Sequence, residues 1–415
     1  VCLFPPLPSK AIRTLLERLT DSSLVLPPDA ESQRYRMLET MRAYARHRLW
    51  VAGEADTALQ QLGTYLLKED SPTEPGTRPT SDYQDWLQWH ADELGNYRGA
   101  IRLAFELGEP ELAGRFALEI HPYLMSAGLI DELEDQLEDA IAFLADEPTP
   151  LRLKLLTLLA GSARNANDPD GKRLLELIHT DAEALEDEGA IGEALALESD
   201  FAFRDGNTEA GLELLSQAIA ALESARSPAL ENAVIVGIDM YNRLGLFDEA
   251  ESLVTRLDSE RADHALTYRD HYMSDALHGT IALYRGDYEQ ATDLFETCAE
   301  HARGLGSVPY GAMLLQKGHA EFGRGNYSAA CRLLDEAIAL MPDRYTVTAI
   351  WFYTFRSLIE LAINGPEAAV PHLRSALDLV ARRDSNLERE EALTCVAEAA
   401  RASGRLEEAA VLHAA

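Results

Sequence analysis

Apolar residues recur at helical spacing along most of the chain. In residues 11–20, Ile12, Leu15, Leu16 and Leu19 fall on one stripe of a helix. Two short strands are expected next, at 23–26 and 34–38, and helices follow at 39–50 and 83–107. The residues of the last helix that we expect to pack are Trp86, Trp89, Leu94, Tyr97 and Ile101.

A single glycine recurs at a nearly constant interval through the second half of the chain. The positions are Gly206, Gly245, Gly286, Gly325, Gly365 and Gly404, separated by 39, 41, 39, 40 and 39 residues. Gly128 lies 78 residues before Gly206, and Asn167 occupies the position halfway between them. A period of this length indicates a solenoid, in which each unit is too small to bury its apolar face alone.

From about residue 108 the pattern predicts pairs of helices. The first helix of each pair ends at the recurring glycine, which suits a left-handed cap, and the second starts after a short turn carrying Asp, Asn or Thr. Small residues, which let helix backbones approach closely, stand seven positions before the glycine or five after it: Ser199, Gly279, Gly318, Ala397, Ala250, Ala291, Ala330 and Ala409. The unit is similar to a tetratricopeptide repeat lengthened to about 39–40 residues.

The predicted fold is therefore all-α: an α-α superhelix of about seven helical hairpins. Three regions are expected along the chain. Residues 1–50 have the layout of the C-terminal half of a winged-helix domain, with helix, strand, wing, strand and helix in order. Residues 51–107 form a helical connector with a proline-rich loop at 68–82, and residues 108–415 form the repeat superhelix.

Composition narrows the classes of partner and compartment. The chain of 415 residues carries a net charge of −33, so its bulk surface should repel nucleic acid, although the charge is equally consistent with solubility alone. Its four cysteines form no CxxC pair, and no apolar run approaches the length of a membrane span, so we expect a cytoplasmic protein. The chain starts at Val1 without Met and stops partway into a unit, and we expect it to be part of a longer protein.

Three segments resemble a known class of bacterial regulator. They read Leu15-Leu-Glu-Arg-Leu-Thr-Asp-Ser-Ser-Leu-Val25, Tyr35-Arg-Met-Leu-Glu-Thr-Met-Arg-Ala-Tyr-Ala-Arg-His-Arg-Leu49 and Asp85-Trp-Leu-Gln-Trp-His-Ala-Asp-Glu-Leu-Gly-Asn-Tyr-Arg-Gly-Ala-Ile-Arg-Leu-Ala-Phe105. They look like the winged helix and linker helix of signal-transduction ATPases of the AfsR/SARP and LuxR (MalT-like) types. In those proteins an NB-ARC nucleotide-binding domain precedes these segments and a long repeat region follows them.

The resemblance implies a switch that senses a signal through its repeats, exchanges ADP for ATP and activates transcription. This chain lacks the parts that would do that chemistry. Gly171-Lys172 is followed by Arg173 and has no glycine five residues before it, so it is no phosphate-binding loop. Gly304-Leu-Gly306 also fails the dinucleotide pattern. No cofactor is therefore expected in this chain, and ATP or ADP is implied only for a parent protein.

Catalytic and metal sites find little support in the pattern of residues. His271, Asp275 and His278 could share one helical face and bind zinc, but residues seven apart on a helix are about 10 Å apart, too far for one ion without a bend. Solvated or groove-lining residues are the favoured interpretation. No G-x-S-x-G or HExxH motif is present, so we expect no enzyme activity.

The concave face of the superhelix is the favoured binding site, because the first helix of each tetratricopeptide hairpin lines it. Counting back from the cap glycines gives the candidate ligand-binding or partner-binding residues Phe203, Asn232, Asp239, Asn242, Met273, Thr280, His319, Phe322, Phe352 and Arg356. The alternative for Phe203, Phe322 and Phe352 is a place in the core between repeats.

We therefore expect the sensor and autoregulatory region of a bacterial transcriptional activator. It would bind a small molecule, peptide or regulatory protein in the groove, contact the parent's own ATPase domain, and bind neither nucleic acid nor membrane directly. A passive scaffold for partner proteins is the rival. A chaperone-tail clamp is disfavoured, since gripping a terminal carboxylate needs several groove cations and this set offers only Arg356.

Overall fold

The computed structural model describes residues 9–28, 34–67, 80–144, 146–166, 170–261, 268–341, 346–381 and 386–405, with Ala409 and Leu412. The described chain is all-α and contains nineteen helices. The first four are α1 (Ser9–Asp21), α2 (Glu39–Ala52), α3 (Ala55–Leu66) and α4 (Thr80–Leu107). None of the helices in these ranges is long and apolar enough to cross a membrane.

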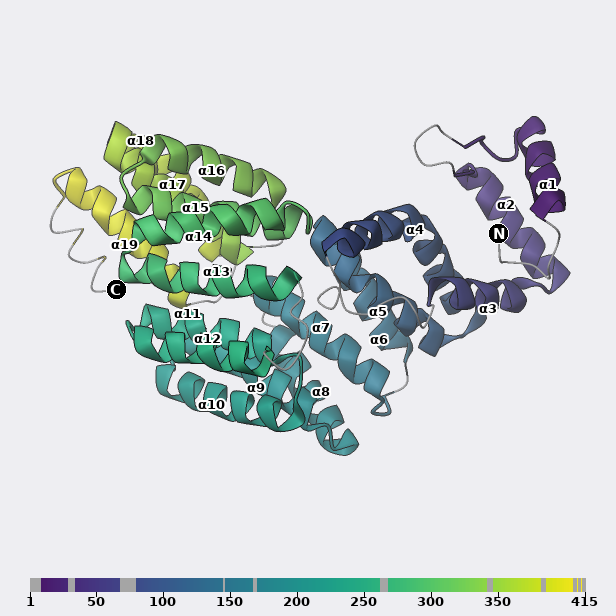
Figure 1. Cartoon of the computed structure of the whole chain (residues 1–415), viewed down its shortest axis with the longest axis horizontal. Coiled ribbons are helices and arrows are strands. Elements are labelled where there is room, and N and C mark those ends of the chain that lie inside the picture. The colour runs from purple at the N-terminus through teal and green to yellow at the C-terminus, as the bar shows by residue number, and fades with distance from the viewer. Residues whose placement is uncertain are drawn as a thin grey trace.

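Seven helical hairpins follow in the described ranges and form the superhelix (Figure 1). They are α5 (Pro110–Ala127) with α6 (Ile130–Phe143), α7 (Pro150–Ala166) with α8 (Asp170–Leu185), α9 (Glu188–Arg204) with α10 (Thr208–Ala225), α11 (Leu230–Arg243) with α12 (Phe247–Arg261), α13 (Tyr268–Arg285) with α14 (Tyr288–Ala302), α15 (Ser307–Gly323) with α16 (Tyr327–Leu340), and α17 (Thr346–Asn364) with α18 (Pro366–Val380). A last helix, α19 (Asn386–Ala402), precedes Gly404.

The recurring glycine follows the end of the first helix of each pair, as the sequence predicts. All seven, from Gly128 to Gly404, have a positive φ between 72° and 88°, which costs glycine little. Gly128 is a left-handed C-cap with ψ of 19°, whereas Gly365, with ψ of 178°, is the N-cap of α18. The next helix often begins at a side-chain cap: Asn207 accepts from the amide of Ala210, and Asp287 from that of Gln290. The position of Asn167 lies outside the described residues.

Small residues bring the two helices of a hairpin together. A Cβ atom on Gly279 would stand 3.0 Å from the ring of Phe295 on α14, and one on Gly318 would stand 3.2 Å from Leu334 on α16. Ala250, Ala291 and Ala330 are fully buried at the facing positions. Helix backbones in these pairs are therefore as close as their side chains allow, as the spacing of small residues predicts.

The N-terminal region differs from the repeats in how little of its apolar surface is covered. The two strands expected at 23–26 and 34–38 are reduced, in the described residues, to one antiparallel bridge between Leu26 and Arg36. The predicted stripe on α1 leaves Leu15 and Leu19 exposed. Helix α4 begins at Thr80, three residues before the predicted start of the helix at residue 83, and residues 68–79 lie outside the described ranges.

The superhelix closes on itself about five hairpins after it begins. Helix α5 contacts α15, α7 contacts α17, and α9 contacts α19, so first helices of early and late hairpins meet across the superhelix axis. In the same way, buried Trp86 of α4 shares an apolar cluster with Tyr272 of α13 and Leu305 after α14. The concave side is therefore an enclosed interior, and the late hairpins lie beside the early ones in Figure 1.

Candidate functional site

One group of side chains joins four helices, α11, α13, α17 and α19, inside the superhelix. Arg243 ends α11, and its Nε donates to Asp239 one turn earlier, at 2.9 Å. Its Nη1 donates to Glu391 of α19 at 2.5 Å, across 148 residues of sequence. Its guanidinium carbon lies 5.0 Å from the ring centroid of Trp351 on α17, a cation–π distance. With Tyr284 of α13, whose charge interactions link it to the same groups, these residues form what we call the axial cluster.

Burial sets the electrostatics of the axial cluster. The Arg243 side chain is only 10% exposed, and Asp239 and Glu391 are about a third exposed, at 27% and 31%. Burial opposes the charge of Arg243, but the nearby Asp239, Tyr284 and Glu391 outweigh it and raise its pKa. Burial and the charge of Asp239 raise the pKa of Tyr284, so its hydroxyl stays protonated. The cluster thus holds one arginine cation and two carboxylates, an excess of one negative charge.

Asn242, next to Arg243 on α11, is buried to 3% exposure, and neither its Oδ1 nor its Nδ2 has a hydrogen-bond partner in the structure. Burying an amide without partners costs about 1–3 kcal/mol, so such a group is rarely kept without a reason. The indole Nε1 of Trp351 is a second buried donor without a partner. Two groups able to bond a ligand thus lie beside or on residues of the axial cluster.

Apart from Asn232, the ten predicted groove residues lie in three kinds of place: in the core between helices, in or beside the axial cluster, or in contact with other neighbouring side chains. Phe203 and Phe352 are buried in the core between helices, the alternative that the sequence left open. Phe322 is half-buried and lies 5.7 Å from Tyr327, in ring contact at the hairpin turn. Asp239 and Asn242 lie in or beside the axial cluster, and Asn232 is exposed on the same helix.

The remaining predicted residues are already engaged by neighbours. His319 packs its ring 3.8 Å from that of Phe355, and burial lowers its pKa to about 4. Thr280 donates to the carbonyl of Ala276, and half-buried Met273 packs between two apolar clusters. Arg356 bonds the Sγ of Cys331 at 2.7 Å and pairs with Glu360 at 2.8 Å and Asp335 at 3.4 Å, a link between α16 and α17 rather than a groove cation.

Four of the five members of the axial cluster are absent from the ten predicted residues. Arg243 and Tyr284 each stand two residues before a cap glycine. Trp351 stands fourteen residues before Gly365, and Glu391 stands thirteen residues before Gly404, the position that Asn232, Met273 and Phe352 hold in earlier hairpins. The charges of Arg243 and Glu391 are the signal that the sequence offers.

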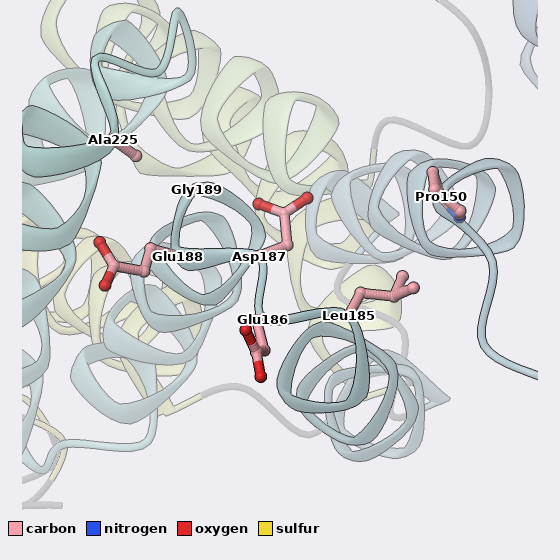
Figure 2. A pocket seen from close by; sticks show the side chains of 7 residues that line it. All are labelled: Pro150, Leu185, Glu186, Asp187, Glu188, Gly189 and Ala225. Carbon is pink, nitrogen blue, oxygen red and sulfur yellow. The ribbon is translucent and has the colours of Figure 1, made fainter.

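An open depression of about 450 Å³ lies elsewhere, where α8 meets α9 (Figure 2). Pro150, Leu185 and three consecutive acidic residues line it, among others. Asp187, one of the three, already accepts from the amide of Ala190 as the N-cap of α9. The depression is wide, acidic and explained by the helix cap, so the axial cluster remains the stronger candidate site.

The residues considered for zinc do not come together as a described cluster. His278 Nδ1 lies 3.2 Å from a carboxylate oxygen of Glu251 on α12, and the side chain of His271 lies outside the described part of the chain. Among described residues, no group of three His, Cys, Asp or Glu side chains is placed to hold a metal ion. The three described cysteines, Cys298, Cys331 and Cys395, are free thiols.

Comparisons with known proteins agree with the fold. No family model matches the chain. Over 108 residues it is 32% identical to an HTH-type transcriptional regulator of Mycobacterium tuberculosis, a match covering 26% of this chain and 12% of that protein. A Rap protein solved in complex with Competence and Sporulation Factor has a TM-score of 0.52 and 14% identity, over 73% of this chain and 85% of Rap. A tetratricopeptide repeat protein from Parabacteroides merdae has a TM-score of 0.41 and 15% identity, over 68% of this chain and 99% of that one.

The fold thus defines a class of protein: a tetratricopeptide-like α-α superhelix. Within it, first helices of early and late hairpins contact one another, and the ion pair between Arg243 and Glu391 joins α11 to α19.

Proposed function

We propose that this chain is the signal-sensing region of a bacterial transcriptional regulator. The superhelix takes a small molecule, peptide or protein segment on its inner face, and the N-terminal region passes the occupancy to an ATPase and DNA-binding part of a longer protein. The chain itself performs no catalysis in this proposal, and ATP or ADP belongs to the parent. The observation that carries it is the buried, unpartnered amide of Asn242 beside the axial cluster.

Two comparisons support the proposal. The short match to a mycobacterial HTH-type regulator supports a role in transcription control. Rap, which shares the fold, was solved in complex with Competence and Sporulation Factor, and we extend to this chain the idea that a superhelix of this kind accommodates a signal. A signal acts as a switch only if it binds one state better than the other, typically by about 1–3 kcal/mol.

The N-terminal region supports a connection to further domains. Between residues 15 and 51, large apolar side chains such as Leu38, Tyr44 and Val51 are more than half exposed. An apolar surface of that kind is usually covered by a neighbouring domain. We propose that the rest of a winged-helix domain covers it in the parent protein, as the sequence resemblance implies.

Thermal unfolding of the chain against cytoplasmic metabolites, nucleotides, peptides and cell-extract fractions tests the proposal. A specific ligand at 100 times its Kd should add about 2.7 kcal/mol, which raises Tm by a few degrees. A shift from a pure compound supports a small-molecule sensor, and a shift from a protein fraction alone supports a partner-binding switch. The absence of any shift would favour the passive scaffold.

Asn242→Ala then tests whether the inner face is the site. Removing an unpartnered buried amide should leave stability unchanged or raised, while affinity for the signal falls. Asn364→Ala is the matched control, because that amide bonds Glu360 of its own helix at an exposed position. Equal loss of affinity in both variants would place the binding site elsewhere.

A further inference from the structure

The ion pair between Arg243 and Glu391 differs from the other buried pairs of the superhelix. Arg164 with Asp200 and Arg152 with Asp181 join residues 36 and 29 positions apart, and so link neighbouring helices of the stack. Arg243 and Glu391 are 148 positions apart. Stacking of successive hairpins does not need this pair, and its effect is to tie α19 to α11 across the interior.

The two carboxylates on Arg243 are not equivalent. Asp239 lies one turn earlier on the same helix and accepts from Nε, so it stays with the arginine whatever the rest of the superhelix does. Glu391 comes from a distant helix, accepts from Nη1, and is 31% exposed, so solvent and solutes can reach it. The guanidinium is a planar fork suited to carboxylates, and Glu391 is the exchangeable one.

The chemistry of whatever replaces Glu391 is restricted. Arg243 is 10% exposed, and leaving a buried charge without its partner is strongly unfavourable, so the replacement must itself be anionic. The amide of Asn242 and the indole Nε1 of Trp351 are further donors with no acceptor in the structure. A carboxylate, like that of Glu391, presents two acceptor oxygens to the guanidinium and is the anion that suits Arg243.

We propose that Arg243 is a carboxylate-binding site, that Glu391 occupies it as an internal ligand, and that the signal presents a carboxylate which displaces Glu391 and so releases α19 from α11. The inference rests on the proposed sensing function and adds the chemical class of the signal. Displacement exchanges one ion pair for another, so its main consequence is the loss of the link across the interior.

Chemical rescue tests this assignment in the full 415-residue chain. Glu391→Ala removes the carboxylate and vacates the site, and propionate supplies a carboxylate on a short alkyl chain. We expect propionate to raise the Tm of this variant and to bind it about tenfold or more tightly than it binds the wild type, because the internal competitor is gone. Propionamide, of the same shape but neutral, should have no effect. Glu391→Gln serves in the same titration if the alanine variant does not fold.

Two controls define the result. Glu390→Ala removes an exposed glutamate next to Glu391, and propionate should not stabilise it at matched ionic strength. Adding Arg243→Gln to Glu391→Ala should abolish the rescue. Equal effects of propionate on the Glu390 and Glu391 variants, or no effect on either, would overturn the assignment.

The experiment separates this inference from the sensing function. A signal that binds the wild type and keeps its affinity in Arg243→Gln would refute the carboxylate site and leave the sensor intact. Propionate rescue, with no compound or fraction binding the wild type, would establish the carboxylate site and remove the sensing role.

Discussion

The backbone of Gly306 at the start of α15 lies directly against the carbonyl oxygen of Ser126 at the end of α5. A Cβ atom at Gly306 would stand 2.4 Å from that oxygen, and Ser307 Oγ reaches the same carbonyl at 3.5 Å. The contact joins the first and sixth hairpins of the superhelix, so it is one of the places where the interior is closed.

Gly306→Ala should therefore open this contact. The new methyl group clashes with backbone, which cannot rotate away, and φ at this residue is 118°, so we expect a loss of about 1–3 kcal/mol and a lower Tm. Gly365→Ala is the control, because its φ of 88° and ψ of 178° resemble the 118° and 176° of Gly306, while nothing lies within 4 Å of the added atom. Equal losses in the two variants would show that α5 and α15 do not press together in solution.

Asp200 should be a major contributor to the stability of the early hairpins. It is 2% exposed and bonds both Arg164 and Arg204 at 2.8 Å. Asp200→Asn removes the carboxylate that buried Arg204 and half-buried Arg164 share, and we expect a loss of about 3–5 kcal/mol, measured as a lower urea midpoint. Asp205→Asn, which affects an exposed pair with Lys172, should cost about 1 kcal/mol or less.

Asp200 also predicts a pH dependence. Burial opposes its charge, but Arg164 and Arg204 outweigh burial and lower its pKa to about 2, below the ordinary value of 3.8. As the pH falls, Asp200 is therefore protonated in the unfolded chain before it is protonated in the folded chain. The stability that the Asp200 carboxylate contributes above pH 4 is lost between about pH 4 and 2. Acid titration of the wild type and of Asp200→Asn should differ in slope in this window and run parallel above it.

His319 should weaken the fold at mildly acidic pH. Burial lowers its pKa to about 4 from 6.5, so below pH 6.5 the unfolded chain is protonated while the folded chain is not. The free energy of unfolding then falls by up to about 1.4 kcal/mol per pH unit for this residue. His319→Gln should make Tm depend less steeply on pH between pH 6.5 and 4. Some dependence should remain, because the pKa of His121 is also lowered to about 4. An unchanged slope would mean that His319 is protonated in the folded protein.

Glu93 on α4 should hold the N-terminal region in place. The carboxylate is almost fully buried and accepts from Tyr65 at 2.7 Å and Asn96 at 2.5 Å, and Arg34 pairs with it at 2.8 Å. Glu93→Gln should free the segment around Arg34, which would be seen as faster protease cleavage between α1 and α2 with little change in the Tm of the repeats. Asp92→Asn, at a more exposed carboxylate 3.4 Å from Arg34, should have the smaller effect.

The register of the repeat predicts a small part of the candidate site. Counting from the cap glycines selected Asp239 and Asn242, and the same counting applied to the last unit would have selected Glu391. The register could not tell that Phe203 and Phe352 join apolar clusters between helices, while Asn242 is buried without a hydrogen-bond partner. That choice depends on how far each first helix is rotated against its neighbours, which the packing of whole side chains decides.

The sequence by itself determined the helices, the hairpin unit and the way in which hairpins end. Those features follow from contacts within one unit: apolar spacing forms the helix faces, glycine allows the left-handed cap, and small residues let paired helices meet. Only the tertiary structure decided that the superhelix closes after about five hairpins and that Arg243 therefore meets Glu391. The small rotation between successive hairpins accumulates along the stack, and a distant contact depends on the sum of all these rotations, which no single repeat specifies.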